Sequence, residues 1–436
     1  MTESHFLPIK SQLNSSAPLI LLYNPISGHG HLDSWNALFV GFLLEAGWRV
    51  ASLSMAADDL RERLARQRLA DHPNLRILEW RAPQRSLYQR IRSKLFRISR
   101  QLITDARTNE VDAAKLKNLE ASYLQPHEFA QRVADATLQL GCKPAFVFNM
   151  YMDLYRDDPL GWRPFAEIHQ TPWAGIRFVP STAPPSDAYY RLSSLKGMCF
   201  LDEHVRHDYA AHLPQKVFEY LPDVTDTNLP DTESSFAIDI THRAAGRKIV
   251  FMGGTIGDKK NLSQWYRLIG LANPAEWFFV QIGEVREQSL GPNDLSAYRQ
   301  ALLESPENLF LHAQYLPDER TFNEVIALSD IVFAVYRKFS ISSNMPGKAA
   351  AFEKPILVAE GYLMGGRVNK YQLGLTVPED DAPQMLHALT RLAQPLAARS
   401  IALPEHFAAY RKDFSHDALK SKFFNFLDQA LALAKI

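Results

Sequence analysis

Two histidines, His29 and His31, lie in a glycine-containing segment (residues 27–33, SGHGHLD) that directly follows an apolar run at residues 18–23 (PLILLY). The apolar run predicts a buried strand, and the glycines predict a turn at the end of it. Histidine is the side chain best suited to proton transfer near neutral pH, so this turn could hold a general base. The spacing alone allows equally that both histidines are ordinary turn residues.

The same turn argues against a dinucleotide cofactor. Gly28 and Gly30 begin like the glycine fingerprint of dinucleotide-binding proteins, but Asp33 stands where the third glycine should be. The next predicted strand ends at residues 52–54 (SLS), so it offers no acidic side chain to bind a ribose. The sequence also lacks a phosphate-binding loop that ends in Lys-Ser or Lys-Thr. These features disfavour a nicotinamide, flavin or P-loop enzyme.

Two later segments could bind phosphate. Residues 253–261 (GGTIGDKKN) follow an apolar run at residues 247–252, and residues 340–348 (SISSNMPGK) lead into a predicted helix. Glycines let a backbone approach a phosphate closely, and hydroxyls and free amides at a helix N-terminus bind anions. Lys259 and Lys260 in the first segment and Lys348 in the second would add positive charge. The alternatives are a strand-to-helix turn with solvated lysines for the first segment and a Ser or Asn helix cap for the second.

Strands and helices alternate along the chain, which is typical of α/β proteins with parallel sheets. One series is predicted in residues 1–222 and a second in residues 247–414. Between them, Pro222, Pro230 and several Asp, Thr and Ser residues predict an interdomain linker at residues 223–246. An amphipathic stretch predicts a last helix at residues 415–436. The predicted strands lie at residues 18–23, 48–53, 75–78, 145–149, 173–179, 198–201, 247–252, 277–282, 309–312, 331–335 and 355–359.

Composition narrows the class of protein further. The chain has 436 residues, and 46% of them are hydrophobic, which is enough for folded cores in two domains. Its 48 basic and 48 acidic side chains balance, so we expect no nucleic-acid partner. No apolar run reaches the roughly 18 residues of a membrane-spanning helix, and the first residues lack the apolar core of a signal peptide. With two cysteines in the chain, we expect a cytoplasmic protein without a Cys-rich metal site.

One segment departs from this charge balance. Residues 84–104 are rich in arginine and contain no acidic residue. Their apolar residues recur every three or four positions, which predicts an amphipathic helix with the stripe Tyr88, Ile91, Leu95, Ile98 and Leu102. Such a helix could bind an anionic membrane surface, on the inner face of the membrane, or an anionic acceptor. Alternatively, the apolar stripe packs into the domain and the arginines are solvated.

Taken together, these segments resemble the GT-B glycosyltransferases, which transfer sugars from nucleotide-sugars. The resemblance is best over residues 247–377. It includes Gly253 to Lys259, residues 309–317 (LFLHAQYLP), residues 328–334 (LSDIVFA), and the stretch from Ser340 through residues 354–358 (KPILV) to residues 365–367 (GGR) and 374–375 (GL). The resemblance implies an α/β fold of two Rossmann-like domains that face each other across a cleft, with the final helix crossing back to the first domain. It also implies a nucleotide-sugar substrate, above all a UDP-sugar, and no other cofactor.

The resemblance also assigns roles to residues. Inverting members of the family often use a histidine of the first loop as the base, which implies His31 as first choice and His29 as second. Asp153, after the strand at residues 145–149, or Asp33 would orient the imidazole, and either could itself be the base. The implied donor-binding residues are Gly254, Thr255, Lys259, Gln314, Tyr315, Leu316, Ser342, Ser343, Asn344, Lys348 and Glu360.

Departures from the family pattern bear on the mechanism. Ser340 and Lys348 stand where retaining members commonly carry two glutamates, and an ammonium cannot accept hydrogen bonds from ribose hydroxyls. No Asp-x-Asp metal motif occurs in the chain. We therefore expect a metal-independent, inverting hexosyltransferase that acts on a hydroxyl of a glycan or lipid-linked acceptor in polysaccharide biosynthesis. A nucleotide-sugar 2-epimerase and a catalytically inactive binding protein of this fold stay open as alternatives.

Overall fold

The computed structural model describes residues 17–26, 31–80, 124–155, 159–180, 185–316, 318–395 and 400–435, with the side chains of residues 31 and 32 excepted. The predicted basic helix at residues 84–104 and His29 lie outside the described residues. The described part of the chain divides into two compact units. Unit 1 contains the described residues up to Tyr220 and those from Lys422 on, and unit 2 runs from Leu221 to Ser421.

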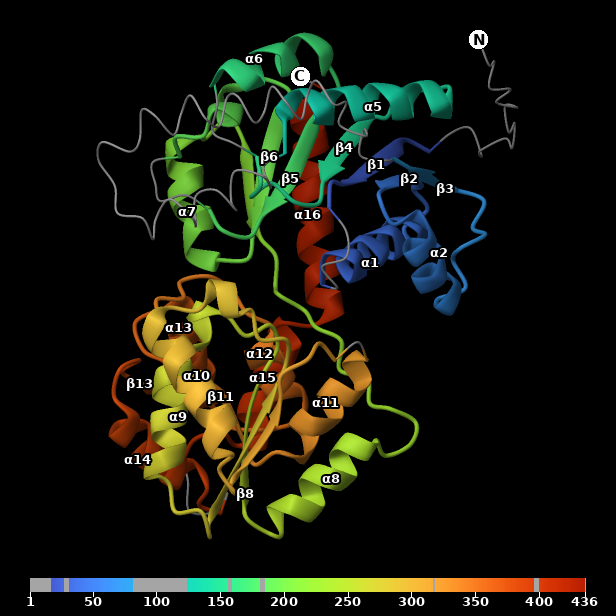
Figure 1. The fold of residues 1–436 in the computed structure, drawn as a ribbon. Coiled ribbons are helices and arrows are strands. Elements are labelled where there is room, and N and C mark those ends of the chain that lie inside the picture. Colours follow the sequence, from blue (N-terminus) through green and yellow to red (C-terminus); the bar gives the residue numbers. More distant parts are fainter. Residues whose placement is uncertain are drawn as a thin grey trace, which may run out of the picture. The chain divides into compact units, whose positions relative to one another are not determined.

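Unit 1 is built on a parallel sheet with the strand order β3-β2-β1-β4-β5-β6-β7 (Figure 1). Its strands are β1 (Leu19–Asn24), β2 (Arg49–Ser54), β3 (Leu75–Glu79), β4 (Phe146–Asn149), β5 (Trp173–Arg177), β6 (Leu195–Phe200) and β7 (Val217–Tyr220). Its helices are α1 (His31–Glu45), α2 (Ala57–Arg66), α5 (Pro126–Leu140), α6 (Pro159–Ile168), the short η1 (Ala188–Arg191), α7 (Glu203–His212) and most of α16 (His416–Ala434). The strand order reverses between β1 and β4, which is where ligands bind in open parallel sheets.

Unit 2 repeats this architecture with the strand order β10-β9-β8-β11-β12-β13. Its strands are β8 (Lys248–Gly253), β9 (Trp277–Ile282), β10 (Leu309–His312), β11 (Ile331–Ala334), β12 (Ile356–Ala359) and β13 (Gly374–Val377). Its helices are α8 (Ser235–Ala244), η2 (Asp258–Lys260), α9 (Leu262–Leu271), η3 (Glu287–Ser289), α10 (Pro292–Glu304), α11 (Glu319–Leu328), α12 (Met345–Ala351), α13 (Leu363–Tyr371), α14 (Ala382–Leu392) and α15 (Pro404–Asp413). In Figure 1, α9 and α14 lie on one side of the sheet and α8 and α11 on the other.

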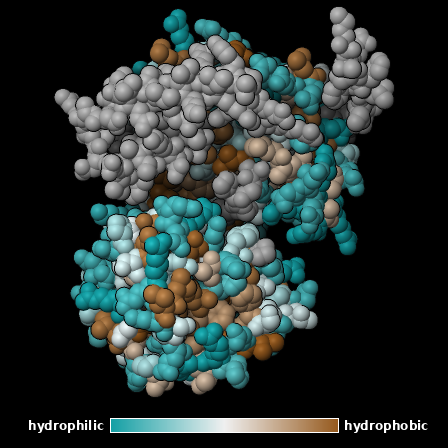
Figure 2. Space-filling view, in the orientation of Figure 1, coloured by the Kyte–Doolittle hydropathy of each residue, from teal (hydrophilic) through white to brown (hydrophobic). Residues whose placement is uncertain are grey.

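The cores follow from the apolar strands. Strands β1 and β9 are buried at every residue, as expected for parallel strands that helices cover on both faces. In unit 1 the last helix completes the core, because Phe423 of α16 contacts Phe39 of α1 and Phe148 of β4 with ring centroids 4.5 and 5.2 Å apart. Polar side chains predominate on the face of unit 2 that Figure 2 shows, with smaller hydrophobic areas between them. None of the described helices combines the length and the apolar character that crossing a membrane requires.

The segment predicted as an interdomain linker has a different structure. Residues 223–246 belong to unit 2 and include helix α8. Ser234 caps this helix by accepting a hydrogen bond from the backbone N–H of Ala237, and Ala237, Ile240 and Ala244 are buried. Two of the Ser residues that suggested a linker, Ser234 and Ser235, therefore start a short helix, because Ser is a strong N-cap.

A buried histidine makes the stability of unit 1 depend on pH. His169 is 3% exposed and packs against Phe129, Phe165 and Trp173. Burial, with a smaller contribution from the charge of Lys143, lowers the pKa of His169 from 6.5 to about 4. Between those two values the unfolded chain binds the proton and the folded chain does not, so the free energy of unfolding falls as the pH drops from 6.5 toward 4.

We expect the His169→Phe variant to lose this pH dependence. The free energy of unfolding of the wild-type chain should be about 2 kcal/mol lower at pH 5 than at pH 7 because of this histidine. The variant should not show this decrease. Urea unfolding of both proteins at pH 7 and pH 5 measures the difference. The exposed His204 provides the control, because His204→Gln should leave the pH dependence as it is in the wild type. An unchanged pH dependence in His169→Phe would contradict the assignment.

Candidate functional site

The strand order of unit 2 reverses between β8 and β11, so the loops that follow these two strands lie at its ligand-binding edge. The loop after β8 holds Gly254, Thr255 and Lys259, and the loop after β11 leads to Ser342, Ser343 and Asn344. The two segments in which the sequence predicts phosphate contacts therefore follow neighbouring strands, as Val332 of β11 pairs with Phe251 of β8.

The glycine turn after β8 needs its glycines. Gly254 has φ +93°, a conformation that side chains disfavour, and its N–H donates to the carbonyl of Ile282 at 3.0 Å. The backbone at Gly283 passes very close to the backbone of Gly254. A Cβ atom on Gly283 would lie 1.9 Å from the carbonyl oxygen of Gly254, so this position also requires glycine. Thr255 and Lys259 are exposed beside this turn. The turn thus presents backbone, a hydroxyl and an ammonium group at the carboxyl edge of the sheet.

Lys260, the second lysine that the sequence places in this segment, lies directly beneath the turn. It is 4% exposed, and its Nζ donates to the carbonyl of Gly253 and to the hydroxyl of Tyr336, both at 2.6 Å. A Cβ atom on Gly254 would lie 3.7 Å from this Nζ. Tyr336 in turn hydrogen-bonds Ser343, so Lys260 connects the two loops. Burial, and then the charge of Lys259, hold the pKa of Lys260 well below its usual value.

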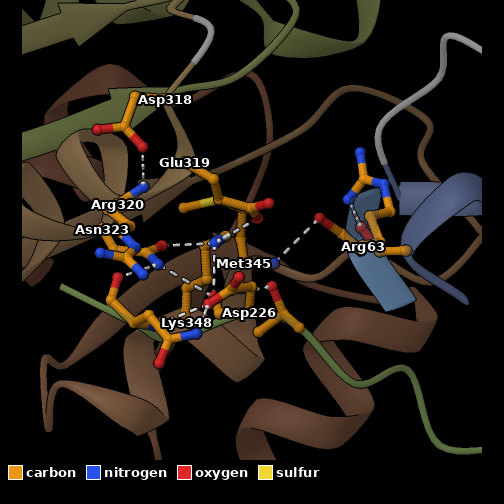
Figure 3. Close-up of polar contacts among 12 residues, drawn as sticks. Arg63, Asp226, Asp318, Glu319, Arg320, Asn323, Met345 and Lys348 are labelled. Atoms are coloured by element: carbon orange, nitrogen blue, oxygen red, sulfur yellow. Dashed lines mark hydrogen bonds and ion pairs between the residues drawn. The ribbon is translucent and has the colours of Figure 1, made fainter. Parts of the chain in front are cut away.

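The structure places Lys348 differently from the prediction. Its Nζ is buried and donates to the backbone carbonyl of Asp226 at 3.0 Å, to Glu319 Oε1 at 2.9 Å and to Asn323 Oδ1 at 2.5 Å (Figure 3). Burial lowers the pKa of Lys348, and the carboxylate of Glu319 opposes that shift. An ammonium has three N–H groups, and these three acceptors use them all. Lys348 therefore fixes α12 to α11 instead of offering a charge to phosphate.

The serine segment is only partly available to a ligand. Ser342 Oγ donates to Asp223 Oδ2 at 2.8 Å and accepts from the buried Arg367 at 2.7 Å, so its hydroxyl is engaged inside unit 2. Ser343 and Asn344 are half-buried, and the Asn344 side chain makes no capping bond to α12. Ser343 and Asn344 are therefore the two residues of this segment that are available to a ligand.

The remaining predicted donor residues lie at neighbouring strand ends. Gln314 and Tyr315 follow β10 and are exposed, with 67% of the Tyr315 surface accessible, and Leu316 is half-buried. Glu360 follows β12 and is exposed, while its backbone N–H donates to the carbonyl of Val377 at 3.0 Å. An exposed aromatic ring, an amide side chain and a carboxylate thus border the same edge of the sheet as the glycine turn.

Arg337 ties the loop after β11 to the helix that follows the glycine turn. Its guanidinium bonds both oxygens of the fully buried Asp294, at 2.8 and 3.1 Å, and Asn261 Oδ1 at 2.7 Å. Its backbone N–H donates to the carbonyl of Lys259 at 2.9 Å. A cavity of about 430 Å³ opens beside these groups, lined also by Ser263, Gln264, Gly291 and Glu379. The charged groups here mostly pair with one another, so we assign Arg337 to holding the glycine loop in place.

In unit 1 two of the predicted catalytic positions, His31 and Asp33, lie at the start of α1, the first helix after β1. The backbone of His31 begins α1, and Asp33 in the first turn is buried, with Oδ1 accepting from Asn24 Nδ2 at 3.3 Å. The position of the His31 imidazole, and its contacts with Asp33 or Asp153, stay a prediction. The helix that carries His31 thus starts where the strand order of this sheet reverses.

Asp153 has a structural partner that the sequence did not indicate. Its carboxylate accepts from the backbone N–H groups of Phe178 and Val179, at 2.9 and 2.6 Å, and so holds the chain that leaves β5. Burial raises the pKa of Asp153, although these two hydrogen bonds and the charge of Arg177 lower it again in part. Within the described residues, no group of three or more His, Cys, Asp or Glu side chains could hold a metal ion.

Solved structures with a similar fold include glycosyltransferases. A UDP-forming α,α-trehalose-phosphate synthase from Burkholderia vietnamiensis has a TM-score of 0.58 and 14% identity, and the match covers 96% of this chain and 98% of that one. Anabaena HepE (Alr3699), solved with UDP and glucose, has a TM-score of 0.62 and 10% identity over 94% and 99% of the two chains. A glycosyltransferase from Rickettsia africae has a TM-score of 0.61 and 10% identity over 95% and 99%.

No protein-family model matches the sequence, and no curated protein matches it in sequence. The sequence has therefore diverged far from those of the structures that share its architecture. At 10–14% identity the likeness is one of fold. The predicted α/β fold with two Rossmann-like domains is confirmed: the chain has the GT-B fold of nucleotide-sugar glycosyltransferases.

Proposed function

We propose that this protein is a glycosyltransferase of the hexosyltransferase type, which moves a sugar from a UDP-sugar to a hydroxyl group of an acceptor. The observation that carries the proposal is the Gly254 turn at the switch point of unit 2, with the buried Lys260 beneath it. A glycine turn admits a diphosphate close to the backbone. A negative charge at that place favours the protonated form of the buried Lys260 amine, which in turn stabilises the diphosphate. Structures of the same fold have been solved with UDP or a UDP-sugar analogue bound, which supports UDP as the nucleotide.

In this proposal the donor lies along the carboxyl edge of the unit 2 sheet. The diphosphate contacts Gly254, Thr255 and Lys259, together with Ser343 and Asn344. The base lies against Gln314, Tyr315 and Leu316, where the exposed Tyr315 ring offers a stacking surface. Glu360 accepts hydrogen bonds from hydroxyls of the sugar. Ser342 and Lys348, whose polar groups are engaged inside unit 2, support the loop instead of touching the donor.

The proposed reaction inverts the anomeric centre and needs no metal ion. His31 takes the proton of the acceptor hydroxyl as the acceptor oxygen forms a bond to the anomeric carbon. The bond from that carbon to the phosphate oxygen breaks at the same time, and the electron pair leaves with the nucleoside diphosphate. Lys259, Lys260 and the backbone of the glycine turn stabilise the charge of the departing diphosphate.

The proposed acceptor is a glycan or a lipid-linked sugar in polysaccharide biosynthesis, at the cytoplasmic face of a membrane. The support is the arginine-rich sequence of residues 84–104, whose apolar stripe and positive charge suit an anionic lipid surface. Binding to vesicles with and without anionic lipid at low salt tests this part of the proposal. Equal binding to both kinds of vesicle would overturn it.

One assay tests the proposed activity against its alternatives. The protein is incubated with radiolabelled UDP-, GDP- and ADP-sugars in the presence of candidate acceptors, and the products are separated. Release of nucleoside diphosphate together with a labelled acceptor supports sugar transfer. Formation of an epimeric nucleotide-sugar supports a 2-epimerase, and binding without any product supports an inactive member of the fold.

The Lys260→Met variant should bind nucleoside diphosphate more weakly by roughly 1–3 kcal/mol, because it removes the cation behind the glycine turn and keeps the length of the side chain. Isothermal titration with UDP measures the change. Lys248→Met serves as the control, because Lys248 is an exposed residue at the start of β8 that pairs with Asp330. Equal affinity in the Lys260→Met, Lys248→Met and wild-type proteins would contradict a role for Lys260 in binding.

A further inference from the structure

Glu319 is an acidic residue at the ligand-binding edge of unit 2 that the proposed function has not used. It is the first residue of α11 and follows the Gln314–Leu316 segment within a few positions. Its side chain is 46% exposed, so a ligand can reach it. In Figure 3 a dashed line joins its carboxylate to the Lys348 ammonium.

The buried Lys348 holds one oxygen of this carboxylate. Lys348 Nζ donates to Glu319 Oε1 at 2.9 Å, while Asp226 and Asn323 on the other sides of the ammonium keep it from moving. The Lys348 side chain is 2% exposed, so water competes little with this bond. In the described part of the chain, Glu319 Oε2 has no hydrogen-bond partner. One oxygen is therefore fixed and the other is free to accept a hydrogen bond.

Glu319 lies where the proposed donor site would hold the ribose of the nucleotide. In the proposed donor site the base lies at the end of β10 and the diphosphate at the ends of β8 and β11, and the ribose joins the two covalently. Glu319 begins the helix that leaves the base segment, and its bond to Lys348 brings it to the helix that leaves the phosphate segment. The carboxylate thus lies at the junction between the base and diphosphate contacts.

We infer that Glu319 accepts a hydrogen bond from a ribose hydroxyl of the donor nucleotide, with its carboxylate held in place by Lys348. An ionised carboxylate is an acceptor only, and an accepting group with a charge makes stronger hydrogen bonds to hydroxyls than a neutral one does. The inference rests on the proposed function, because it takes a nucleoside diphosphate as the ligand. It adds that the site distinguishes ribonucleotides from deoxyribonucleotides.

The test compares UDP with 2′-deoxy-UDP and 3′-deoxy-UDP by isothermal titration, in the wild type and in the Glu319→Ala and Glu319→Gln variants. We expect the wild type to bind at least one deoxy analogue about 10-fold more weakly than UDP. In Glu319→Ala, UDP should bind about 10-fold more weakly than in the wild type, and the difference between UDP and that analogue should disappear. Glu319→Gln keeps the shape of the side chain and should lose most of the discrimination.

Glu304→Gln is the matched control, because Glu304 is an exposed residue of α10 that bonds Gln300 of the same helix. It should bind all three nucleotides as the wild type does. If UDP binds but both Glu319 variants discriminate as the wild type does, the inference is wrong and the proposed function stands. If UDP, ADP and GDP all fail to bind the wild-type protein, the proposed function fails, and the inference fails with it.

Discussion

The His31→Ala variant is expected to bind nucleoside diphosphate with unchanged affinity and to transfer sugar about 10²–10⁴-fold more slowly, because removing a general base typically has an effect of this size. His31 begins α1 at the switch point of unit 1, and the donor contacts that we propose lie in unit 2. The mutation should therefore lower kcat and leave the affinity for the diphosphate nearly intact. Single-turnover transfer rates and titration with UDP measure the two quantities separately.

The competing bases define the controls for this experiment. His29→Ala should have a milder effect than His31→Ala if His31 is the base. Asp33→Ala removes a buried carboxylate that hydrogen-bonds Asn24, and Asp153→Ala removes the acceptor for two backbone N–H groups, so both should also lower stability. Transfer rates of the four variants, normalised to the folded fraction, decide between them. Near-normal turnover in His31→Ala would rule out its assignment.

The Arg337→Met variant is expected to lower the free energy of unfolding by about 3–5 kcal/mol. The Arg337 side chain is 28% exposed, but Asp294 has no exposed surface at all, so removing the guanidinium leaves a buried carboxylate without a counter-charge. The variant also loses the hydrogen bonds to Asn261 and Ser263, which start α9. Urea unfolding at neutral pH, followed by circular dichroism, measures the loss.

A second substitution separates the charge from the packing. Asp294→Asn keeps an acceptor for the backbone N–H of Ser263 but removes the buried charge, so the double variant with Arg337→Met should regain at least half of the lost stability. Arg299→Met, which removes an exposed ion pair with Glu287, should change stability by less than about 1 kcal/mol. A loss in Arg337→Met as small as that in Arg299→Met would contradict the importance of the buried pair.

Much of the fold could be predicted because parallel strands covered on both faces are continuous apolar runs. The strand at residues 277–282 was predicted at its observed bounds, and the first strand was predicted one residue early. The predictions omitted β7, which reads VFEY and carries a buried glutamate, and β13, which reads GLTV. Both are edge strands of four residues, so neither produces a long apolar run.

The candidate site was harder to predict, because a lysine has the same sequence signature whether it points to solvent or into the protein. Lys259 and Lys260 are neighbours in the sequence, yet the first is exposed and the second is buried against Tyr336, 76 positions away. Lys348 was predicted to bind phosphate from its place before a helix. Its partner Glu319 is 29 positions away in sequence, and only the packing of α11 against α12 brings the two together.

The C-terminal helix has a consequence for the order in which the chain can fold. Unit 2 is continuous from Leu221 to Ser421, whereas unit 1 needs residues from Lys422 onward, including Phe423 against Phe39 and Phe148. As the ribosome releases the chain, the whole of unit 2 therefore emerges before unit 1 can complete its core. Phe39 and Phe148 are synthesised long before Phe423, so both lack this aromatic partner until after the whole of unit 2 has been made. The second unit in the sequence is thus the first that can fold to completion.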